Sequence, residues 1–533
     1  MALEDRGSGD PRHSGEPRDR SGDPGHDVVL VGYGPVGETL AILLAQRGWR
    51  VGVFEKQPAA YALPRAVHFD HEVARILQAA GIADGFAGLT ETADCYEWRN
   101  AAGETLLRFH SRPMGASGWP EGNMFPQPEL ERLLDTRVRA FANVDVERGC
   151  EIVDLAVDAA GVTLSAARAD GERVEARARF VVGCDGANSF VRSQIGATVT
   201  DLGFFYDWLI VDVLPHRPTR WSPLNVQICD PQRPTTMVSG GPGRRRWEFM
   251  RLPGESIEEL NSEATAWRLL APWGVRREDA RLERHTVYRF QARWVDGWRQ
   301  GRILLAGDAA HQMPPFAGQG MCAGVRDAAN LAWKLDLVLA GTAPESLLDT
   351  YEPERVQHVR LAIGASMELG KVICIADPAE AAARDRAMIS AAAAGQRMTM
   401  PAAMPIGAGV GRAGDATAGQ LFIQGRVRHR GISGLFDDVV GRGWTLLAVG
   451  GDPLAHLDPE TAAFLSSLGG ITAHIDDGGI EDLDGTYRRW FDEHGVGVVL
   501  QRPDFYLFGS APRVEDAGAL IADLRRKLGS ASP

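Results

Sequence analysis

The stretch DVVLVGYGPVGETLAILLAQRGWRVGVFEK, residues 27–56, decides the fold. It predicts a buried apolar strand, a glycine-rich turn, a helix that runs to about Gln46, and a second strand that ends at Glu55. The glycines follow the pattern GxGxxG, and an acid stands about 20 residues beyond them, which completes the βαβ dinucleotide fingerprint. The stretch therefore predicts an α/β, Rossmann-like domain that holds a nucleotide.

Each glycine of the fingerprint has a physical role. Gly32 makes the tight turn, Gly34 lets the backbone approach a diphosphate, and Gly37 lets the helix pack against the strand. Glu55 would accept hydrogen bonds from a ribose diol. An acid at this position disfavours a 2′-phosphate, which favours FAD or NAD over NADP. A glycine-rich turn without a ligand is the weaker alternative.

A second stretch also predicts a strand, a glycine-containing loop and a helix: GRILLAGDAAHQMPPFAGQGMCAGVRDAANLAWKL, residues 301–335. An apolar strand breaks sharply at Gly307-Asp308, Pro314-Pro315 predicts an extended loop, and Gly318-Gln319-Gly320 opens a long helix. The unpaired N–H groups and the positive dipole end of that helix suit a flat ring that becomes anionic on reduction. This pattern favours a flavin.

Further candidate ligand contacts follow predicted strands or open helices. FVVGCDGANSFVR (residues 180–192) ends a strand on Asp185-Gly186, and strand carboxyl ends are where α/β sheets bind ligands. Arg65, in PRAVHFD, could reach the diphosphate, with a solvated surface arginine as the alternative. Gln127 precedes a predicted helix as a polar ligand contact, and Arg132 stands in its first turns.

The remaining pattern divides the chain into domains. Residues 1–26 predict a disordered tail, residues 27–199 and 285–395 a discontinuous nucleotide-binding domain, and residues 396–419 a linker. Residues 200–284 predict a mostly antiparallel β-sheet domain, whose aromatic side chains form a core and partly line a cavity for the substrate.

Residues 420–533 predict a C-terminal unit whose order of strands and helices resembles a thioredoxin-like fold. It holds no cysteine, so it cannot run dithiol chemistry. A packing or dimerisation module is the favoured reading, which leaves a homodimer open. As a separate module, it should be removable without loss of a flavin bound elsewhere.

Composition limits the classes of function. The 533 residues are 44% hydrophobic and 24% charged, which is typical of a soluble globular protein. The net charge of −13 gives no support for binding nucleic acid. The six cysteines contain no CxxC pair, which argues against disulfides and metal sites, and the chain has no targeting or membrane segment. A cytoplasmic protein is expected.

Taken together, GYGPVG with Glu55, CDGANSFVR and the 301–335 stretch resemble the single-component FAD-dependent aromatic hydroxylases, the class A flavoprotein monooxygenases. The resemblance covers roughly residues 27–370. The thioredoxin-like unit also resembles the subgroup that contains phenol hydroxylase and 3-(3-hydroxyphenyl)propionate hydroxylase. PRAVHFD and residues 320–324 look most like the latter branch.

The resemblance implies a set of cofactor contacts. Those at the adenosine and diphosphate end are Gly32, Gly34, Pro35, Val36, Gly37, Glu55, Lys56, Arg65, Gln127 and Arg132. Asp308 would hold the ribityl chain, and Asp185 and Gly186 belong to a motif associated with both FAD and the nicotinamide donor. Those at the flavin ring are Gly307, Pro315, Gly318, Gln319, Gly320, Met321 and Cys322. Many relatives carry Asn at the position of Cys322, so backbone is expected to replace that side-chain contact.

The resemblance also implies the reaction. NADH or NADPH reduces the flavin, O₂ adds to form a flavin hydroperoxide, and its distal oxygen is transferred to a ring carbon ortho or para to a phenol. The substrate is a small phenol of the 3-(3-hydroxyphenyl)propionate type or a polycyclic polyketide-type phenol. His68 and Tyr288 are the candidates for assisting deprotonation of the phenol, and a packed, non-catalytic histidine is the alternative for His68.

Other flavoprotein classes fit less well. A flavin disulfide reductase needs a cysteine pair, and a flavin halogenase needs a Trp-rich segment and an active-site lysine, none of which the sequence contains. A non-catalytic flavin-binding sensor remains as the alternative to an enzyme. Substrate-stimulated oxidation of NADH or NADPH separates the two.

Overall fold

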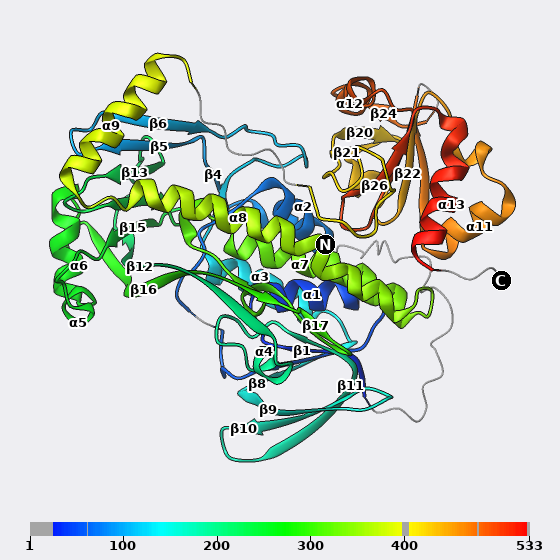
Figure 1. Cartoon of the computed structure of the whole chain (residues 1–533), viewed down its shortest axis with the longest axis horizontal. Coiled ribbons are helices and arrows are strands. Elements are labelled where there is room, and N and C mark those ends of the chain that lie inside the picture. Colours follow the sequence, from blue (N-terminus) through cyan, green and yellow to red (C-terminus); the bar gives the residue numbers. More distant parts are fainter. Residues whose placement is uncertain (1–24, 61, 397–404, 477–478, 530–533) are drawn as a thin grey trace, which may run out of the picture.

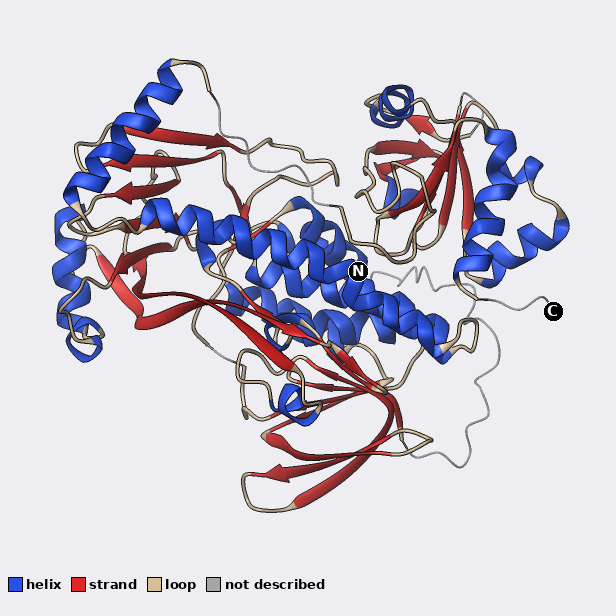
Figure 2. Ribbon diagram, in the orientation of Figure 1, coloured by secondary structure: helices blue, strands red, loops and turns tan. Residues whose placement is uncertain are grey.

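The computed structural model describes residues 25–60, 62–396, 405–476 and 479–529. Two large sheets with helices between them make up most of the chain, and a smaller unit lies at one end (Figures 1 and 2). The predicted tail falls outside the described residues except for Gly25 and His26, and His26 already opens the first strand. No helix in the described part of the chain is long and apolar enough to span a membrane.

The first sheet contains the predicted βαβ unit. Strands β1 (His26–Val31) and β2 (Val51–Glu55) lie parallel and flank helix α1 (Pro35–Ala45) in sequence. The sheet order is β17 (Arg299–Gln300), β18 (Ile303–Leu305), β11 (Arg173–Gly183), β1, β2 and β8 (Val144–Arg148), with β9 (Cys150–Val157) and β10 (Val162–Arg168) continuing from β11. This parallel centre brings the carboxyl ends of β1, β11 and β18 to one edge.

The second sheet is antiparallel apart from one parallel pair. Its order is β19 (His311–Gln312), β16 (Ala280–Asp296), β12 (Thr198–Pro215), β15 (Arg245–Met250), β14 (Thr235–Ser239), β13 (Asn225–Cys229), β5 (Cys95–Asn100) and β6 (Thr105–His110). The predicted unit of residues 200–284 is therefore too narrow. The parallel pairing of β5 with β13 joins residues far apart in sequence, which local patterns do not reveal.

The two faces of the second sheet pack differently. One face carries Val211 and Trp247 against the small helix α6 (Glu263–Leu270). The opposite face carries Trp208 and Ile210, which pack against Phe316 of the loop before α7 (Gly320–Leu339). We call the second one the inner face, because it turns toward the predicted flavin loop.

Helices join the sheets. Helix α7 packs against α1, and α8 (Tyr351–Ile373) crosses toward the inner face, followed by α9 (Pro378–Ala393) (Figure 2). Two shorter strand-to-helix units belong to the same part of the molecule. Helix α2 (His71–Ala80) follows strand β3 (His68–Phe69), and α3 (Gln127–Arg139) follows β7 (Asn123–Met124). Strand β4 (Glu91–Thr92) and β3 both pair with β7.

The C-terminal unit contains a sheet ordered β23 (Ile471–Ile475), β22 (Thr445–Val449), β25 (Val498–Gln501) and β26 (Leu507–Ala511). Among these four strands, β22 and β23 run parallel, and the pairs β22–β25 and β25–β26 are antiparallel. Helices α11 (Pro459–Ser467), α12 (Thr486–His494) and α13 (Ala517–Lys527) surround it, together with a small sheet of β20 (Arg426–His429), β21 (Ile432–Leu435) and β24 (Glu481–Asp482).

Residues 405–419, part of the predicted linker, are packed rather than free. Gly407 N–H donates to the carbonyl of Glu354 at 2.8 Å, and Val410 N–H donates to the Glu354 carboxylate at 2.6 Å. Arg412 contacts Asp523 of the C-terminal unit at 2.7 Å. The segment therefore binds both parts of the molecule, and residues 397–404 of the predicted linker lie outside the described residues.

Candidate active site

The turn after β1 has the geometry that its glycines predict. Gly32 has φ +103°, and a Cβ there would lie 2.4 Å from the carbonyl oxygen of Cys184. A Cβ on Gly37 would lie 2.3 Å from the carbonyl oxygen of Gly32, whereas a Cβ on Gly34 would meet no atom within 4 Å. The turn is thus closed against the protein and open at Gly34. Helix α1, with Pro35 in its first turn, begins without a side-chain cap.

Glu55 lies at the end of β2, close to this turn. Its carboxylate accepts hydrogen bonds from the backbone N–H groups of Tyr33 at 2.9 Å and Gln57 at 2.8 Å. Lys56 is exposed beside it, and Arg65 is exposed nearby. Burial raises the pKa values of both Glu131 and Asp308, and the positive charge of Arg65 opposes both shifts. Arg65 is therefore near Glu131 of α3 and near Asp308.

The loop after β18 is held from below by a buried carboxylate. Asp327 of α7 accepts from Gly307 N–H at 3.0 Å and contacts His311 at 2.6 Å and Arg355 at 2.8 Å. Burial opposes the charge, but His311 and Arg355 outweigh it and hold the pKa of Asp327 well below its usual range. Asp308, which follows Gly307, is exposed to solvent, and the protein atoms packed around it raise its pKa by partial desolvation. Asp308 is therefore available to a ligand.

The loop before α7 also presents backbone. Gly318 has φ +64°, and its carbonyl lies 3.5 Å from Nδ1 of His68. Helix α7 starts at Gly320 without a side-chain cap. The buried Cys322 thiol points to the carbonyl oxygens of His68 and Gly318 at 3.9 and 3.7 Å. The Cys322 thiol is therefore engaged within the protein, and the backbone contact to a ligand stays a prediction.

A row of charged groups lies on the inner face of the second sheet. Arg246 binds Asp212 through two bonds of 2.7 and 3.1 Å and donates to the carbonyls of Arg65 and Pro64 at 2.6 and 3.1 Å. Arg284, opposite Asp212, lies over the ring of Tyr288 at 4.7 Å. The sheet is thereby fixed to the segment that leads to His68.

Glu248 belongs to the same row and is a candidate that the sequence analysis missed. It lies opposite Ile210 and Thr236, 3.7 Å from Arg246, and its side chain is 13% exposed. Burial raises its pKa to about 6, with Arg246 opposing and Asp212 reinforcing the shift. The Arg-x-Glu alternation in RRWEFM places Arg246 and Glu248 on one face of a strand. The sequence does not show which face of that strand turns inward, so Glu248 could not be chosen from it.

The two predicted catalytic residues, His68 and Tyr288, lie on different elements: His68 on β3 and Tyr288 on β16. Burial lowers the pKa of His68, so its ring is neutral near pH 7, and it rests against Gly318. Tyr288 lies on the inner face, paired with Trp208. Phe290 and Phe316 pack on the same inner face as Tyr288, with their ring centroids 5.9 Å apart.

Other predicted contacts serve the protein itself. The buried Gln127 accepts from Ala66 N–H and donates to Glu131, both at 2.6 Å, so its side chain orients the Arg65 segment. Arg132 is exposed, and its nearest acid is Glu129 at 3.6 Å. Asp185 accepts from the hydroxyl of Ser189 and from Val191 N–H, and Ser189 in turn caps the short helix α4 (Phe190–Gln194). Gly186, at φ +77°, faces open space.

The remaining predicted contacts lie in or beside the Gly307 turn and the loop before α7. Val36 packs under Gly307, Pro315 opens a single 3₁₀ turn, and Met321 is half-buried in the first turn of α7. Gln319 is also half-buried, but its side chain amide is bound by Asp70 and Arg326. Its backbone is therefore the part available to a ligand.

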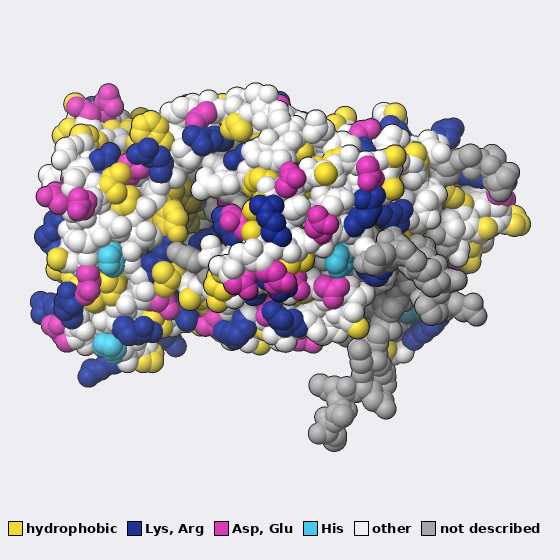
Figure 3. Space-filling view, turned by 90° about the horizontal axis from the view of Figure 1, so that it is seen from below, with side chains coloured by type: hydrophobic (Ala, Val, Ile, Leu, Met, Phe, Trp, Pro, Cys, Tyr) yellow, Lys and Arg dark blue, Asp and Glu magenta, His cyan; other side chains and the backbone are white. Residues whose placement is uncertain are grey.

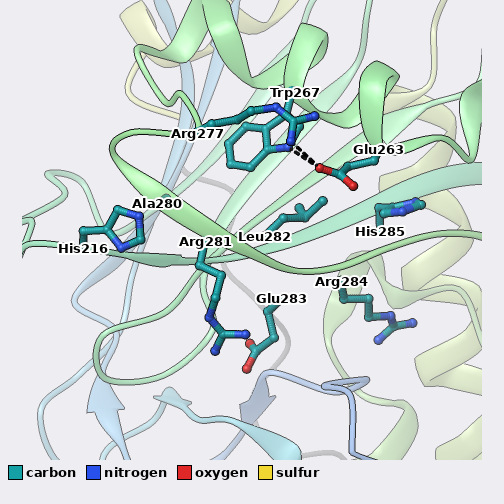
Figure 4. A pocket seen from close by; sticks show the side chains of 10 residues that line it. All are labelled: His216, Glu263, Trp267, Arg277, Ala280, Arg281, Leu282, Glu283, Arg284 and His285. Carbon is teal, nitrogen blue, oxygen red and sulfur yellow. Dashed lines mark hydrogen bonds and ion pairs between the residues drawn. The ribbon is translucent and has the colours of Figure 1, made fainter.

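Two hollows border the site. One, of about 320 Å³, is lined by Arg192, Arg293 and Asp308, among others. The other, of about 510 Å³, runs along the free edge of β16 and contains Arg284 (Figure 4). In Figure 4, Arg281, Glu283 and Arg284 project to one side of the strand, while Trp267, held with Arg277 by Glu263, lies on the other. On the face in Figure 3, acidic and basic side chains are interspersed.

Comparisons with known proteins agree with this geometry. Residues 25–366 match the family described as FAD binding domain, and residues 419–527 match the HcaD C-terminal domain. A probable NADH-specific resorcinol 4-hydroxylase of Rhodococcus jostii (strain RHA1) is 38% identical, over 93% of this chain and 94% of the relative. A 3-(3-hydroxy-phenyl)propionate/3-hydroxycinnamic acid hydroxylase of Comamonas testosteroni is 32% identical, over 95% of this chain and 97% of the relative.

The chain belongs to the FAD-dependent aromatic hydroxylases.

Solved structures share the fold of this hydroxylase. The flavin-dependent monooxygenase PieE, in complex with FAD and substrate, has a TM-score of 0.81 at 23% identity, covering 96% of this chain and all 100% of PieE. Aklavinone-11 hydroxylase with FAD and aklavinone has a TM-score of 0.78 at 25% identity, covering 95% and 99%. The protein is thus an FAD-dependent monooxygenase with a nicotinamide co-substrate, and the sensor alternative is wrong.

The described residues of the hydroxylase fit FAD. Two helix starts, at Gly34 and Gln319, carry no side-chain cap and leave backbone N–H groups for a ligand. Open space stands beside Gly34, and the side chains of Arg65 and Asp308 are exposed. An elongated dinucleotide with a diphosphate at one helix and a ring at the other matches this arrangement.

We expect Asp308→Ala to lower the FAD content of the purified hydroxylase. The carboxylate is exposed in the turn after β18, so its loss removes acceptors for the hydroxyl groups of a ribityl chain. Loss of about two such bonds corresponds to roughly 10- to 100-fold weaker binding. Flavin absorbance per protein, and titration of the apoprotein with FAD, measure the effect. Undiminished affinity would contradict the contact; Asp349→Ala, an exposed acid elsewhere, is the control.

Proposed function

We propose that FAD lies with its diphosphate at Gly32–Gly37, its adenosine ribose at Glu55, its ribityl chain at Asp308 and its ring at residues 315–322. The uncapped helix starts and the exposed Asp308 support this placement. FAD supplies hydride acceptance from the nicotinamide and activation of O₂. The chain's own residues position the phenol, exclude water and accept its proton.

We infer that the substrate is a small, neutral phenol of the resorcinol type. The observation that carries this is the carboxylate of Glu248 on the inner face, partly exposed within a row of buried charges. The neighbouring Arg246 is occupied by Asp212 and by two carbonyls, so it is not available to a substrate carboxylate. At an effective dielectric constant near 20, two like charges about 4 Å apart repel by about 4 kcal/mol. The resemblance to a probable resorcinol 4-hydroxylase supports the same substrate class.

Glu248 then accepts the proton of the phenol. Deprotonation raises the electron density of the ring carbons ortho and para to the oxygen, which is where the hydroxyl group is added. A carboxylate with a pKa of about 6 is ionised at neutral pH and still basic enough to share a phenolic proton. Other polar side chains lie close to Glu248. Thr236, which pairs with Glu248, donates to Gln227 at 2.6 Å, and Tyr96 donates to the same Gln227 at 3.1 Å. His68 and Tyr288, predicted from the sequence to assist deprotonation, are proposed instead to orient the second hydroxyl group.

We expect Glu248→Gln to lower kcat/KM for resorcinol by about 100-fold, the lower range for a general base. In the wild-type protein, kcat/KM should fall as pH decreases through about 6, because protonated Glu248 no longer accepts a proton. The variant should lack that inflection. NADH oxidation with product mass measures both. A variant with wild-type kcat/KM and pH profile would exclude Glu248 as the proton acceptor.

The control is Glu97→Gln. Glu97 lies next to Tyr96 and Trp98 on β5 but points to the opposite face, where Arg99 and Arg108 bind it. It should alter stability without changing the pH profile. A wild-type enzyme that turns over 3-(3-hydroxyphenyl)propionate faster than resorcinol would contradict the substrate class, whatever the result for Glu248.

The C-terminal unit is proposed to be thioredoxin-like. Its sheet order, with β22 and β23 parallel and β25 and β26 antiparallel to their neighbours, supports this fold. Its contribution to the enzyme is structural, since the unit has no cysteine between residues 405 and 529.

A further inference from the structure

Helix α2 connects the C-terminal unit with the loop before α7. On one side, Arg75 enters the C-terminal unit, where Asp437 binds it at 2.7 Å and the ring of Phe505 lies 4.2 Å from its guanidinium carbon. At its start, α2 is capped by Asp70, whose carboxylate accepts from Glu72 N–H and Val73 N–H. The helix therefore contacts both the C-terminal unit and the ring-side loop.

A buried chain of hydrogen bonds runs along this connection. Tyr506, between β25 and β26, donates its hydroxyl to Oε1 of Glu72 at 2.6 Å. Oε2 of Glu72 accepts from Nε of Arg326 at 2.5 Å. Burial, reinforced by Glu72, raises the pKa of Tyr506 well above its usual value, so the phenol is a permanent donor. All three side chains are nearly inaccessible to solvent.

Arg326 extends the chain to Gln319. Its Nη1 donates to the side-chain oxygen of Gln319 at 3.0 Å, and its Nη2 contacts Asp70 at 2.5 Å. The amide nitrogen of Gln319 donates to the same Asp70 carboxylate at 3.2 Å. The side chain of Gln319 is thus held at both ends, and Gln319 is the residue immediately before α7. This fixes the backbone that starts the helix.

We propose that Tyr506 is a positioning residue for the flavin: through Glu72 and Arg326 it holds the Gln319 backbone in the orientation that contacts the ring. The C-terminal unit then completes the cofactor site without touching the cofactor. Fixed partners of this kind reduce the ordering that binding would otherwise require. The inference rests on the proposed placement of the ring at residues 315–322; Asp308→Ala separately tests the ribityl contact of the same proposed FAD placement.

The test is Tyr506→Phe in the full-length protein. The change removes one hydroxyl group and leaves the ring in place. We expect the dissociation constant of FAD, measured by quenching of flavin fluorescence on titration of the apoprotein, to rise about tenfold, or about 1.4 kcal/mol. The visible circular dichroism of the bound flavin should change as well, because this signal reports the asymmetry around the ring.

Tyr487→Phe is the matched control. Tyr487 is also buried in the C-terminal unit, and its oxygen accepts one hydrogen bond, from Gly425 N–H at 3.1 Å. It has no place in the chain to Gln319. We expect its FAD dissociation constant to stay within about twofold of wild type. If Tyr506→Phe behaves like this control in both affinity and circular dichroism, the proposal is overturned.

A double-mutant cycle keeps the proposal testable if Tyr506→Phe lowers stability. Gln319→Met removes the anchored amide at the other end of the chain and should weaken FAD binding in the same direction. Both changes break the same chain of hydrogen bonds, so their effects should not add. The FAD dissociation constant of the double variant should be at most about twice that of whichever single variant binds FAD less tightly. Full additivity of the two effects would show that the ends act independently and would refute the proposal.

Discussion

Replacing Asp327 with Ala should destabilise the hydroxylase more than any other single change at the site. The carboxylate is fully buried and binds Gly307 N–H, His311 and Arg355. Its removal leaves the charge of Arg355 buried without its anion, a loss that typically costs about 3–5 kcal/mol. The Gly307-Asp308 turn also loses its anchor, so we expect little or no FAD in the purified variant. Chemical denaturation and flavin absorbance measure the two effects.

The pH dependence gives a second readout for Asp327. Because its pKa is lowered in the folded protein, the ionised carboxylate contributes stability above its unfolded pKa of about 3.9. That contribution is lost as pH falls below this value, and the Ala variant should lack this part of the acid destabilisation. Asp349→Ala, whose side chain is 66% exposed beside Arg299, should change the free energy of unfolding by less than about 1 kcal/mol. An Asp327→Ala protein as stable as this control would contradict the expectation.

Much of the nucleotide-binding part could be predicted because local patterns encode it. The strand, glycine turn and helix of residues 27–56 follow from periodicity and from the steric demands of Gly32 and Gly37. The Gly307-Asp308 break and the start of α7 were readable in the same way. These elements depend on neighbours in sequence, which a single sequence contains.

Features that depend on distant pairing could not be predicted. The second sheet recruits β5 and β6 across more than a hundred residues, so the limits of residues 200–284 were wrong. Glu248 becomes a candidate only when the register shows that it shares a face with Ile210 and Trp208. Asp327 reads from the sequence as one acid in a long helix, and only the packing of α7 under the Gly307 turn reveals its partners.

The contact between the C-terminal unit and α7 was also invisible in the sequence. Arg502, from the turn after β25, binds Glu354 of α8 at 2.7 Å and Asp504 at 2.6 Å. Lys334 of α7 binds the same Glu354 at 2.8 Å, and Asn330 donates to both acids. Two cations and two carboxylates thus balance in a buried cluster. The expectation that residues 420–533 can be deleted without loss of flavin does not fit this interface.

We therefore expect Arg502→Met to destabilise the whole protein by about 3–5 kcal/mol, because Lys334 alone then faces two buried carboxylates. Since the cluster joins both parts, the wild-type chain should melt in one calorimetric transition, and the variant should lower the temperature for both parts together. Arg513→Met is the control, because Arg513 is 70% exposed and pairs with Asp516 at 3.1 Å on the surface. Two separate transitions in the wild type, or an Arg502→Met protein as stable as the control, would show that the C-terminal unit is an independent module.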